Sequence, residues 1–259
     1  MRSVCFFVLV VGAVGCGRLG YDTQVDPAGE TPDAAAPADA ANSDAPAVDL
    51  PGLDVPGLVG HYLIDGDDPG RNVTGTGADG TCTVCPDPLA DQARGAVFAF
   101  RDGAYAMVEH DPRFITENGF TVALWIKPRS YDIYMTAVTK IYGSGNTNSW
   151  KLNNAADAVG FETYDGVNIK EMNIAETPLP LNTWSHVVLR WDGTTKALYH
   201  DGVLLGAEDT TIAFDDGDLY FGVDFDFGVT TQAFDGLLYD LRIYDRAVTE
   251  DEIARIIGN

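Results

Sequence analysis

The most constraining feature of this sequence is the stretch 184–202, which reads WSHVVLRWDGTTKALYHDG. Its first part, 186–191, alternates residue by residue between two faces, which is the period-2 pattern of a strand with one buried side. Two Asp-Gly pairs, Asp192-Gly193 and Asp201-Gly202, then supply tight turns. Gly accepts positive φ and Asp hydrogen-bonds its own backbone, so such pairs favour hairpins. The stretch therefore predicts consecutive antiparallel strands.

Short runs of the same kind recur along the chain, separated by clusters of Gly, Asn, Asp and Pro. This spacing is typical of a sandwich or jelly roll. The run 236–244 is almost continuously apolar, so we expect it to be a central strand. A short helix is predicted from Thr249, because 249–252 forms a capping box. Further strands are expected at 57–64, 104–110, 120–128, 137–142, 149–153, 159–164, 167–173 and 218–225.

The N-terminus has the features of an export signal. A short basic start precedes the apolar run 4–14, which is too short to cross a bilayer as a helix of about 20 residues. The run ends in Ala13-Val14-Gly15-Cys16, which resembles a bacterial lipobox. We interpret residues 1–16 as a lipoprotein signal peptide with Cys16 as the lipidation site. The alternative is an ordinary signal peptide with a chance Cys.

Residues 17–56 are dominated by Ala, Pro, Asp and Gly. A segment of this composition cannot bury enough apolar surface to offset its ordering entropy, so it is expected to be a disordered, extended linker. The remaining residues, 57–259, are long enough for one β-sandwich with a sizeable core. The predicted organisation is thus a signal peptide, a spacer and a single domain.

The chain is strongly acidic, with 39 Asp and Glu against 16 Lys and Arg and a formal net charge of −23. Such a field repels nucleic acid and anionic lipid. We therefore expect no nucleic-acid partner, and membrane contact only through the lipid anchor. Cations and neutral sugars remain compatible with this charge.

A Cys-x-x-Cys pair, Cys82 and Cys85, lies in the Gly-rich loop 65–94. A redox centre requires a helix N-terminus in a βαβ context, and a zinc site requires further ligands. An exported protein favours a disulfide instead. We predict that Cys82 and Cys85 form a local disulfide.

Four stretches carry a family resemblance. The stretch 184–202 resembles the W-x-H-V…D-G…L-Y-x-D-G signature of the concanavalin A-like lectin/glucanase superfamily, in its laminin-G-like branch. The stretches 98–105 and 120–128 are similar to its early strands, and 234–244 to its closing strand. The resemblance extends over 57–259. It implies an all-β fold, an antiparallel β-sandwich of the concanavalin A-like jelly-roll type with a short C-terminal helix, but no particular function.

The same resemblance implies a structural calcium ion between the early turn and the closing strand. Carried over to this sequence, the metal ligands are Asp102 and Asp240, although Tyr239 stands where the family usually has a further Asp. The acidic turns 65–68 and 215–218 also have the oxygen-rich composition that calcium prefers. Calcium is therefore the expected cofactor, in a structural role.

Catalysis is the sharper hypothesis, because glucanases of this fold carry several acids on one strand. The nearest approach here is Asp224-Phe225-Asp226, which lacks a third acid and a Glu. It is expected to be a loop at a strand end. Motifs of serine hydrolases, metalloproteases and P-loop proteins do not occur. We predict that the protein is not an enzyme.

Five aromatic residues in the Gly- and Asn-rich region 131–165 could stack against sugar rings. The alternative is that several of them are core residues of alternating strands. We expect Trp125, Trp184 and Trp191 in or near the core. The five candidates are Tyr131, Tyr134, Tyr142, Trp150 and Tyr164.

These features predict a non-catalytic binding or adhesion module anchored at the bacterial cell envelope, at the outer membrane or the cell surface. Its expected partner is a polysaccharide, or a cell-surface glycan or protein. A glycan-active hydrolase or lyase is one alternative, and a structural cell-envelope protein is another. The hydrolase would require Asp224, Asp226 or Glu162 to meet another acid in a concave groove.

Overall fold

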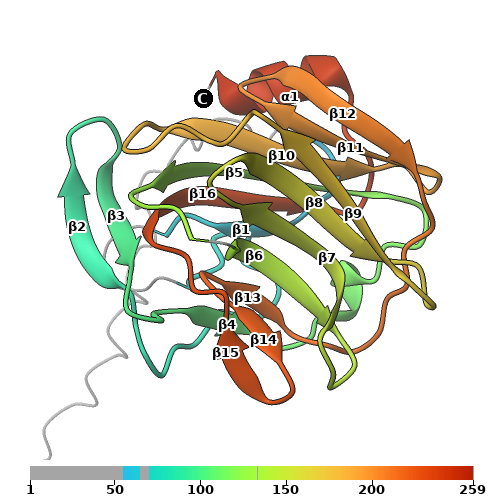
Figure 1. Cartoon of the computed structure of the whole chain (residues 1–259), viewed down its shortest axis with the longest axis horizontal. Helices are drawn as coiled ribbons and strands as arrows, with labels where there is room; N and C mark the ends of the chain where they lie inside the picture. The colour runs from blue at the N-terminus through green and yellow to red at the C-terminus, as the bar shows by residue number, and fades with distance from the viewer. Residues whose placement is uncertain (1–54, 65–69, 133, 259) are drawn as a thin grey trace, which may run out of the picture. The chain divides into compact units, whose positions relative to one another are not determined.

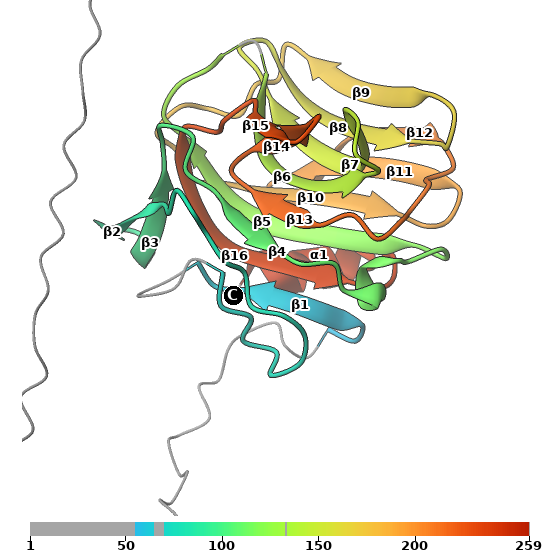
Figure 2. The same ribbon diagram turned by 90° about the horizontal axis from the view of Figure 1, so that it is seen from below.

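A computed structural model of the protein describes residues 55–64, 70–132 and 134–258. In this part of the chain, two antiparallel sheets stack as layers, and a two-stranded hairpin and one α-helix accompany them (Figures 1 and 2). The predicted all-β sandwich with a short C-terminal helix is confirmed. The predicted signal peptide, Cys16 and the linker up to residue 54 lie outside the described residues.

The elements follow one another without long helices between them. In chain order they are β1 (Leu58–Tyr62), β2 (Asp87–Asp91), β3 (Gly95–Phe100), β4 (Ala106–Val108), the 3₁₀ turn Pro112–Phe114, β5 (Phe120–Pro128), β6 (Met135–Tyr142), β7 (Thr147–Asn154), β8 (Ala158–Tyr164), β9 (Ile169–Ala175), β10 (Ser185–Trp191), β11 (Thr195–His200), β12 (Val203–Asp209), β13 (Leu219–Phe221), β14 (Asp224–Asp226), β15 (Val229–Thr231), β16 (Gly236–Tyr244) and α1 (Glu250–Ile257).

The larger described sheet has eight strands, in the order β12-β11-β10-β5-β16-β3-β2, with β1 also paired to β16. The smaller has six, in the order β4-β13-β6-β7-β8-β9. The closing strand β16 pairs with β5, β3 and β1, and is central as its apolar sequence predicts. The hairpin β14–β15 forms a small sheet of its own.

The hairpin predicted from 184–202 is present, and its turns use the expected chemistry. β10 pairs with β11 in continuous antiparallel register. At the first turn, Asp192 Oδ1 accepts from the backbone N–H groups of Thr194 (3.0 Å) and Thr195 (2.8 Å). At the second, Asp201 and Gly202 adopt φ values of 49° and 79°. Two successive positive φ angles give the strand twist that a two-residue hairpin needs.

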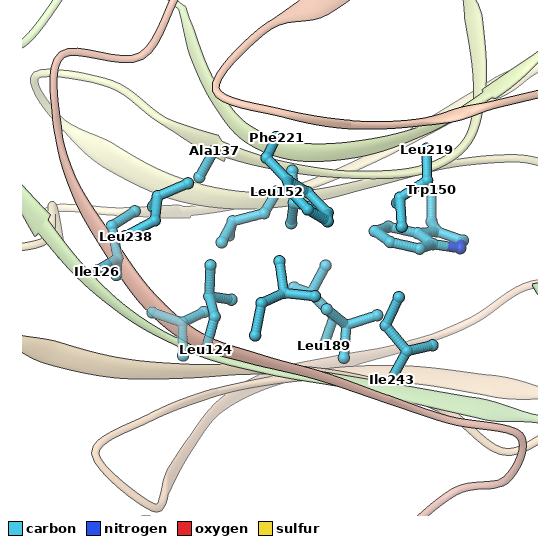
Figure 3. Close-up of a cluster of buried hydrophobic side chains, with 14 of the residues drawn as sticks. Leu124, Ile126, Ala137, Trp150, Leu152, Leu189, Leu219, Phe221, Leu238 and Ile243 are labelled. Atoms are coloured by element: carbon cyan, nitrogen blue, oxygen red, sulfur yellow. The ribbon is translucent and has the colours of Figure 1, made fainter. Parts of the chain in front are cut away.

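The core lies between the two sheets, where side chains from the facing surfaces meet (Figure 3). Leu124, Ile126 and Leu189 come from the eight-stranded sheet and meet Leu152 and Phe221 of the other. Fully burying one such side chain contributes about 1.5–3 kcal/mol to folding. The pairing of the two layers therefore rests on the inward half of each alternating strand.

The three tryptophans expected in or near the core lie on both sides of the eight-stranded sheet. Trp191 is buried in the core between the sheets, whereas Trp125 and Trp184 are half-buried on the outer surface, where Trp184 packs against a smaller buried cluster. The reason is alternation along β5: Leu124 and Ile126 point into the core, so Trp125 between them points out.

Helix α1 covers part of the outer surface of the eight-stranded sheet (Figure 2). Its Ile253 and Ile256 are buried against that sheet. The predicted capping box is present, since Thr249 accepts from the backbone of Glu252 and Glu252 accepts from that of Thr249. Hydrogen bonds from Arg246 and from the Thr249 backbone lower the pKa of Glu252 to about 2. Within the described residues, the outer surface of the six-stranded sheet carries no helix.

The loop predicted for 65–94 contains a strand that the sequence analysis did not expect. β2 pairs with β3 at the edge of the eight-stranded sheet. Pro88 within it cannot donate a ladder hydrogen bond, which is tolerated only at an edge. The predicted disulfide between Cys82 and Cys85 is present, with Cα atoms 5.0 Å apart.

Candidate functional site

The outer surface of the six-stranded sheet carries a row of small polar residues. Asn153, Gly160 and Asn173 are direct cross-strand partners on β7, β8 and β9, and Thr136 of β6 extends the row. The neighbours of these residues along each strand, such as Leu152 and Phe161, point into the core. Strand alternation therefore directs the row away from the core.

A groove of about 550 Å³ opens over this row. Four short Ala side chains in its lining leave space beside the row, and Tyr134, which also lines it, is 50% exposed. Small lining residues beside one aromatic ring and several amides give a surface with both stacking and hydrogen-bonding capacity. The groove is lined by Tyr134, Asn153, Ala155, Ala156, Asp157, Ala158, Gly160, Asn173 and Ala175.

A close side-chain contact explains why position 160 in this row is a glycine. A Cβ atom built at Gly160 would overlap Oδ1 of Asn173. The Asn173 side chain therefore leans over Gly160, and any larger residue at that position would displace it. Position 160 keeps the centre of the groove open.

Glu171 fixes the orientation of the Asn173 amide. Nδ2 of Asn173 donates to Oε2 of Glu171 at 3.0 Å. Because an ionised carboxylate only accepts, the amide nitrogen must face Glu171 and Oδ1 must face Gly160. On the other side of the glycine, Asn153 Oδ1 is 3.4 Å from Thr136 Oγ1. The groove thus offers a fixed acceptor on Asn173 and an amide on Asn153.

Beside the groove on the same surface lies a buried ion network centred on Lys151 of β7. Its Nζ is 2.7 Å from Oδ2 of Asp224 and 3.3 Å from Oε2 of Glu162. Asn148 Nδ2 also donates to Asp224 at 3.2 Å. Burial raises the pKa of Glu162, an effect that Lys151 only partly offsets. Burial lowers the pKa of Lys151, but the two acids outweigh it and the pKa lies above its ordinary value.

The hydrolase alternative required Asp224, Asp226 or Glu162 to meet another acid in a concave groove. Asp224 and Glu162 do converge, but on an ammonium group rather than on an open groove. All three side chains are almost completely buried. Asp224 begins β14, which is a short strand and not the loop expected from the sequence. Lys151 lies between the two acids, and its ion pair with Asp224 links β14 to the six-stranded sheet.

The five aromatic candidates from 131–165 fall into four groups. Trp150 is a core residue at 2% exposure, stacked on Phe120. Tyr131 is half-buried and donates to the backbone oxygen of Leu179. Tyr142 and Tyr164 contact each other, with ring centres 4.9 Å apart. Tyr134 alone of the five lines the groove.

The two predicted calcium ligands lie in different environments. Asp102 is exposed in the turn after β3, with a φ of 54°. Asp240 is buried, and its carboxylate accepts from Arg242 (2.8 and 2.9 Å) and faces His61 Nε2 at 2.6 Å. The Asp240 carboxylate is thus already paired with Arg242 and His61. Calcium at Asp102 and Asp240 stays a prediction.

Among the residues that the structure describes, no group of three or more His, Cys, Asp or Glu side chains is placed to hold a metal ion. The acidic turn 65–68 lies outside the described residues. The acidic turn 215–218 is described and is discussed below.

The sequence analysis missed an aromatic cluster on the outer surface of the eight-stranded sheet. The guanidinium of Arg94 lies 3.5 Å from the centre of the Trp125 ring, with Tyr239 at 5.7 Å and Trp184 at 6.0 Å. Asp91 accepts from Trp184 Nε1 at 3.0 Å. Arg94 covers Trp125, so the cluster secures the β2–β3 turn. The alternation of Trp125 with core residues was the signal available in the sequence.

The two-layer antiparallel fold with a groove on one sheet defines a β-sandwich of the jelly-roll class. A laminin-G family model, described as "Concanavalin A-like lectin/glucanases superfamily", matches residues 101–254. The chain belongs to this superfamily, as the resemblance implied.

Solved structures show the same fold at low sequence identity. The binding domain of Paraclostridial Mosquitocidal Protein 1 has a TM-score of 0.64 at 14% identity, over 78% of this chain and 52% of that one. Domain 4 of AbnA, a GH43 extracellular arabinanase from Geobacillus stearothermophilus, in complex with arabinotriose, has 0.63 at 18%, over 77% and 98%. The botulinum neurotoxin serotype C1 binding domain has 0.59 at 12%, over 78% and 52%. This chain spans about half the length of the toxin chains.

No curated protein matches this sequence. In the described part of the chain, no helix has the length and apolarity required for a membrane span.

Proposed function

We propose that this protein is a non-catalytic carbohydrate-binding module that holds a neutral glycan in the groove over Asn153, Gly160 and Asn173. The observation that carries the proposal is the groove itself, where an exposed tyrosine contributes to the lining and two amides flank a glycine. Sugar sites combine an aromatic platform with a few polar groups that pair with hydroxyls. The acceptor on Asn173 and the amide of Asn153 suit two hydroxyls of one saccharide.

The charge of the site favours a neutral ligand. Asp157 lines the groove and Glu171 holds Asn173 beside it, in a chain with a net charge of −23. A uronate or sulfated glycan would meet like charge there. Neutral hexose or pentose polymers would not.

Known relatives of the fold support a binding role. One structural neighbour is described in complex with arabinotriose, and others are described as binding domains of toxins. A further description links entry of botulinum neurotoxin type C to two ganglioside molecules. From these proteins we carry over to this chain only the chemical class of the ligand, a saccharide, and we propose that it binds in the groove.

We further propose that the module is displayed at the bacterial cell envelope. The support is in the sequence: a lipobox-like Cys16 after an apolar signal, followed by the Ala/Pro/Asp-rich segment 17–56. Lipid on Cys16 would hold the chain on the membrane, and an extended spacer would lift the sandwich off it.

Alanine substitution of Asn153 and Asn173 together is expected to weaken glycan binding about tenfold or more, since each amide contributes a hydrogen bond or two. Tyr134→Ala should weaken it through loss of stacking. The measurement is a glycan array of neutral and anionic polysaccharides, followed by calorimetry on the best ligand, with calcium and with a chelator. Phe227→Ala is the control, because Phe227 is 73% exposed and lies outside the groove.

Equal binding by the wild type and all groove variants would place the ligand elsewhere. An array without any bound glycan would contradict the proposal and favour a protein partner or a structural role. If chromatography shows that the protein cleaves a bound glycan into shorter fragments, the hydrolase alternative would be favoured.

A further inference from the structure

The acidic turn Asp215-Asp216-Gly217-Asp218 is tightly organised next to β6 and β13. Oδ1 of Asp215 accepts from the backbone of Gly217 (2.9 Å), and Oδ2 accepts from that of Gly143 (2.5 Å). Oδ1 of Asp218 accepts from the backbone of His110 at 2.9 Å. The carboxylates are therefore drawn into the protein and do not all face solvent. Three like charges in one short turn require compensation.

That compensation comes from Lys140 of β6. Its strand partners are Leu219 and Trp150, both core residues, so Lys140 points inward. It is 0% exposed. Its Nζ donates to the backbone oxygen of Gly217, and to that of Asp215 at 3.3 Å. Backbone oxygens beside carboxylates are the ligand types that a calcium ion uses.

The balance of charge is consistent with this arrangement. Burial lowers the pKa of Lys140, and the charges of Asp215, Asp218 and Asp216 offset this only in part. The backbone oxygens of Asp215 and Gly217 replace the water that the buried ammonium loses.

Gly217 allows this close approach. A Cβ atom built there would overlap the backbone oxygen of Ile141 on β6. The turn therefore presses directly against the strand that carries Lys140, which brings its carbonyl oxygens within reach of the ammonium.

We infer that the turn 215–218 is a cation site whose permanent occupant is the ammonium of Lys140. The chain supplies its own cation at a turn whose composition resembles a calcium loop, so this turn requires no calcium. Asp240 is likewise paired with a side-chain cation, the guanidinium of Arg242.

Lys140→Ala tests the inference, because it removes the ammonium and leaves the oxygens in place. We expect the full-length variant to melt at a lower temperature than the wild type. Millimolar calcium or ethylammonium should restore part of the loss, since a ligand that binds only the folded state raises its stability. The quantity measured is the cation-induced shift in Tm of the variant minus that of the wild type. Calcium bound elsewhere, as at Asp102, cancels in this difference.

Lys196→Ala is the matched control. Lys196 is equally buried, and its Nζ donates to the backbone oxygens of Phe161 (3.2 Å) and Lys170 (2.7 Å). Its ion-pair partner is the single, half-exposed Glu208 at 3.6 Å. This variant should also melt lower, but calcium should not restore it.

Lys140→Gln is a second variant for the case that Lys140→Ala does not fold. Gln removes the charge but keeps an N–H donor for the backbone oxygens. It should likewise show a positive calcium-induced difference in Tm. If calcium and ethylammonium shift the wild type and both Lys140 variants equally, or shift none of them, the turn is not a cation site and the inference is overturned.

Discussion

Replacement of Lys151 by Met is expected to lower the free energy of unfolding by about 3–5 kcal/mol at neutral pH. Met keeps the length of the side chain but removes the positive charge that contacts both Asp224 and Glu162 in the buried network. Both acids are less than a tenth exposed, so water cannot replace the lost partner. The cost is that of two buried carboxylates left without a counter-ion.

The measurement is urea unfolding of the full-length wild type and variant. Adding Glu162→Gln and Asp224→Asn to Lys151→Met should recover most of the loss, because the buried charges are then removed together. Lys170→Met is the control for losing an ion pair of more accessible groups, since Lys170 and its partner Asp165, 3.3 Å away, are 39% and 17% exposed. Its effect should be clearly smaller. Equal losses from the two lysine variants would contradict the buried-network account.

A second large effect is expected in acid. Burial lowers the pKa of His186 from 6.5 to about 3; the charge of Asp240 opposes this shift, and those of Arg242 and Arg94 add to it. Between these two values the unfolded chain binds a proton that the folded chain does not. The stability contributed by neutral His186 is therefore fully present above about pH 6.5. It falls as the pH drops towards 3, at up to about 1.4 kcal/mol per pH unit.

His186→Phe should remove this slope, because Phe does not titrate and can keep the ring contact with Trp125, whose centre lies 5.1 Å from that of His186. The experiment compares the free energy of unfolding of the wild type and the variant at neutral pH and at about pH 4. Other acid-sensitive groups, such as Asp240, are common to both proteins and cancel in the difference. Parallel loss of stability in the two proteins would mean that the buried imidazole does not control the acid response.

Local interactions were predictable because their partners are close in the chain. The Asp192 turn, the Asp201-Gly202 turn and the Thr249–Glu252 capping box each lie within four residues. The disulfide is similar, since Cys82 and Cys85 are separated by three positions. Alternation along β10 likewise predicted a strand with one buried face, and the almost continuously apolar run of β16 predicted a central strand. Family resemblance supplied the assembly of these strands into a sandwich.

The groove was only partly predictable. Tyr134 was among the five aromatic candidates, but nothing in the sequence separated it from Trp150, which is buried. The row formed by Asn153, Gly160 and Asn173 depends on the register of three strands. A shift of one residue in either pairing would turn one of these side chains to the opposite face. Register over such distances is set by the packed core and is not visible in any one strand.

The sequence by itself determined the strands, their turns, the helix cap and the acidic character of the chain, because these follow from short-range periodicity and composition. Only the tertiary structure decided which charges meet. It placed Lys151 between Asp224 and Glu162, Lys140 in the turn 215–218 and Arg242 on Asp240. Lys151 is separated from Asp224 by 73 positions, and Lys140 from Gly217 by 77. Such pairs form because burying one charge makes an opposite charge or an oxygen cradle necessary, and the fold decides which one is within reach.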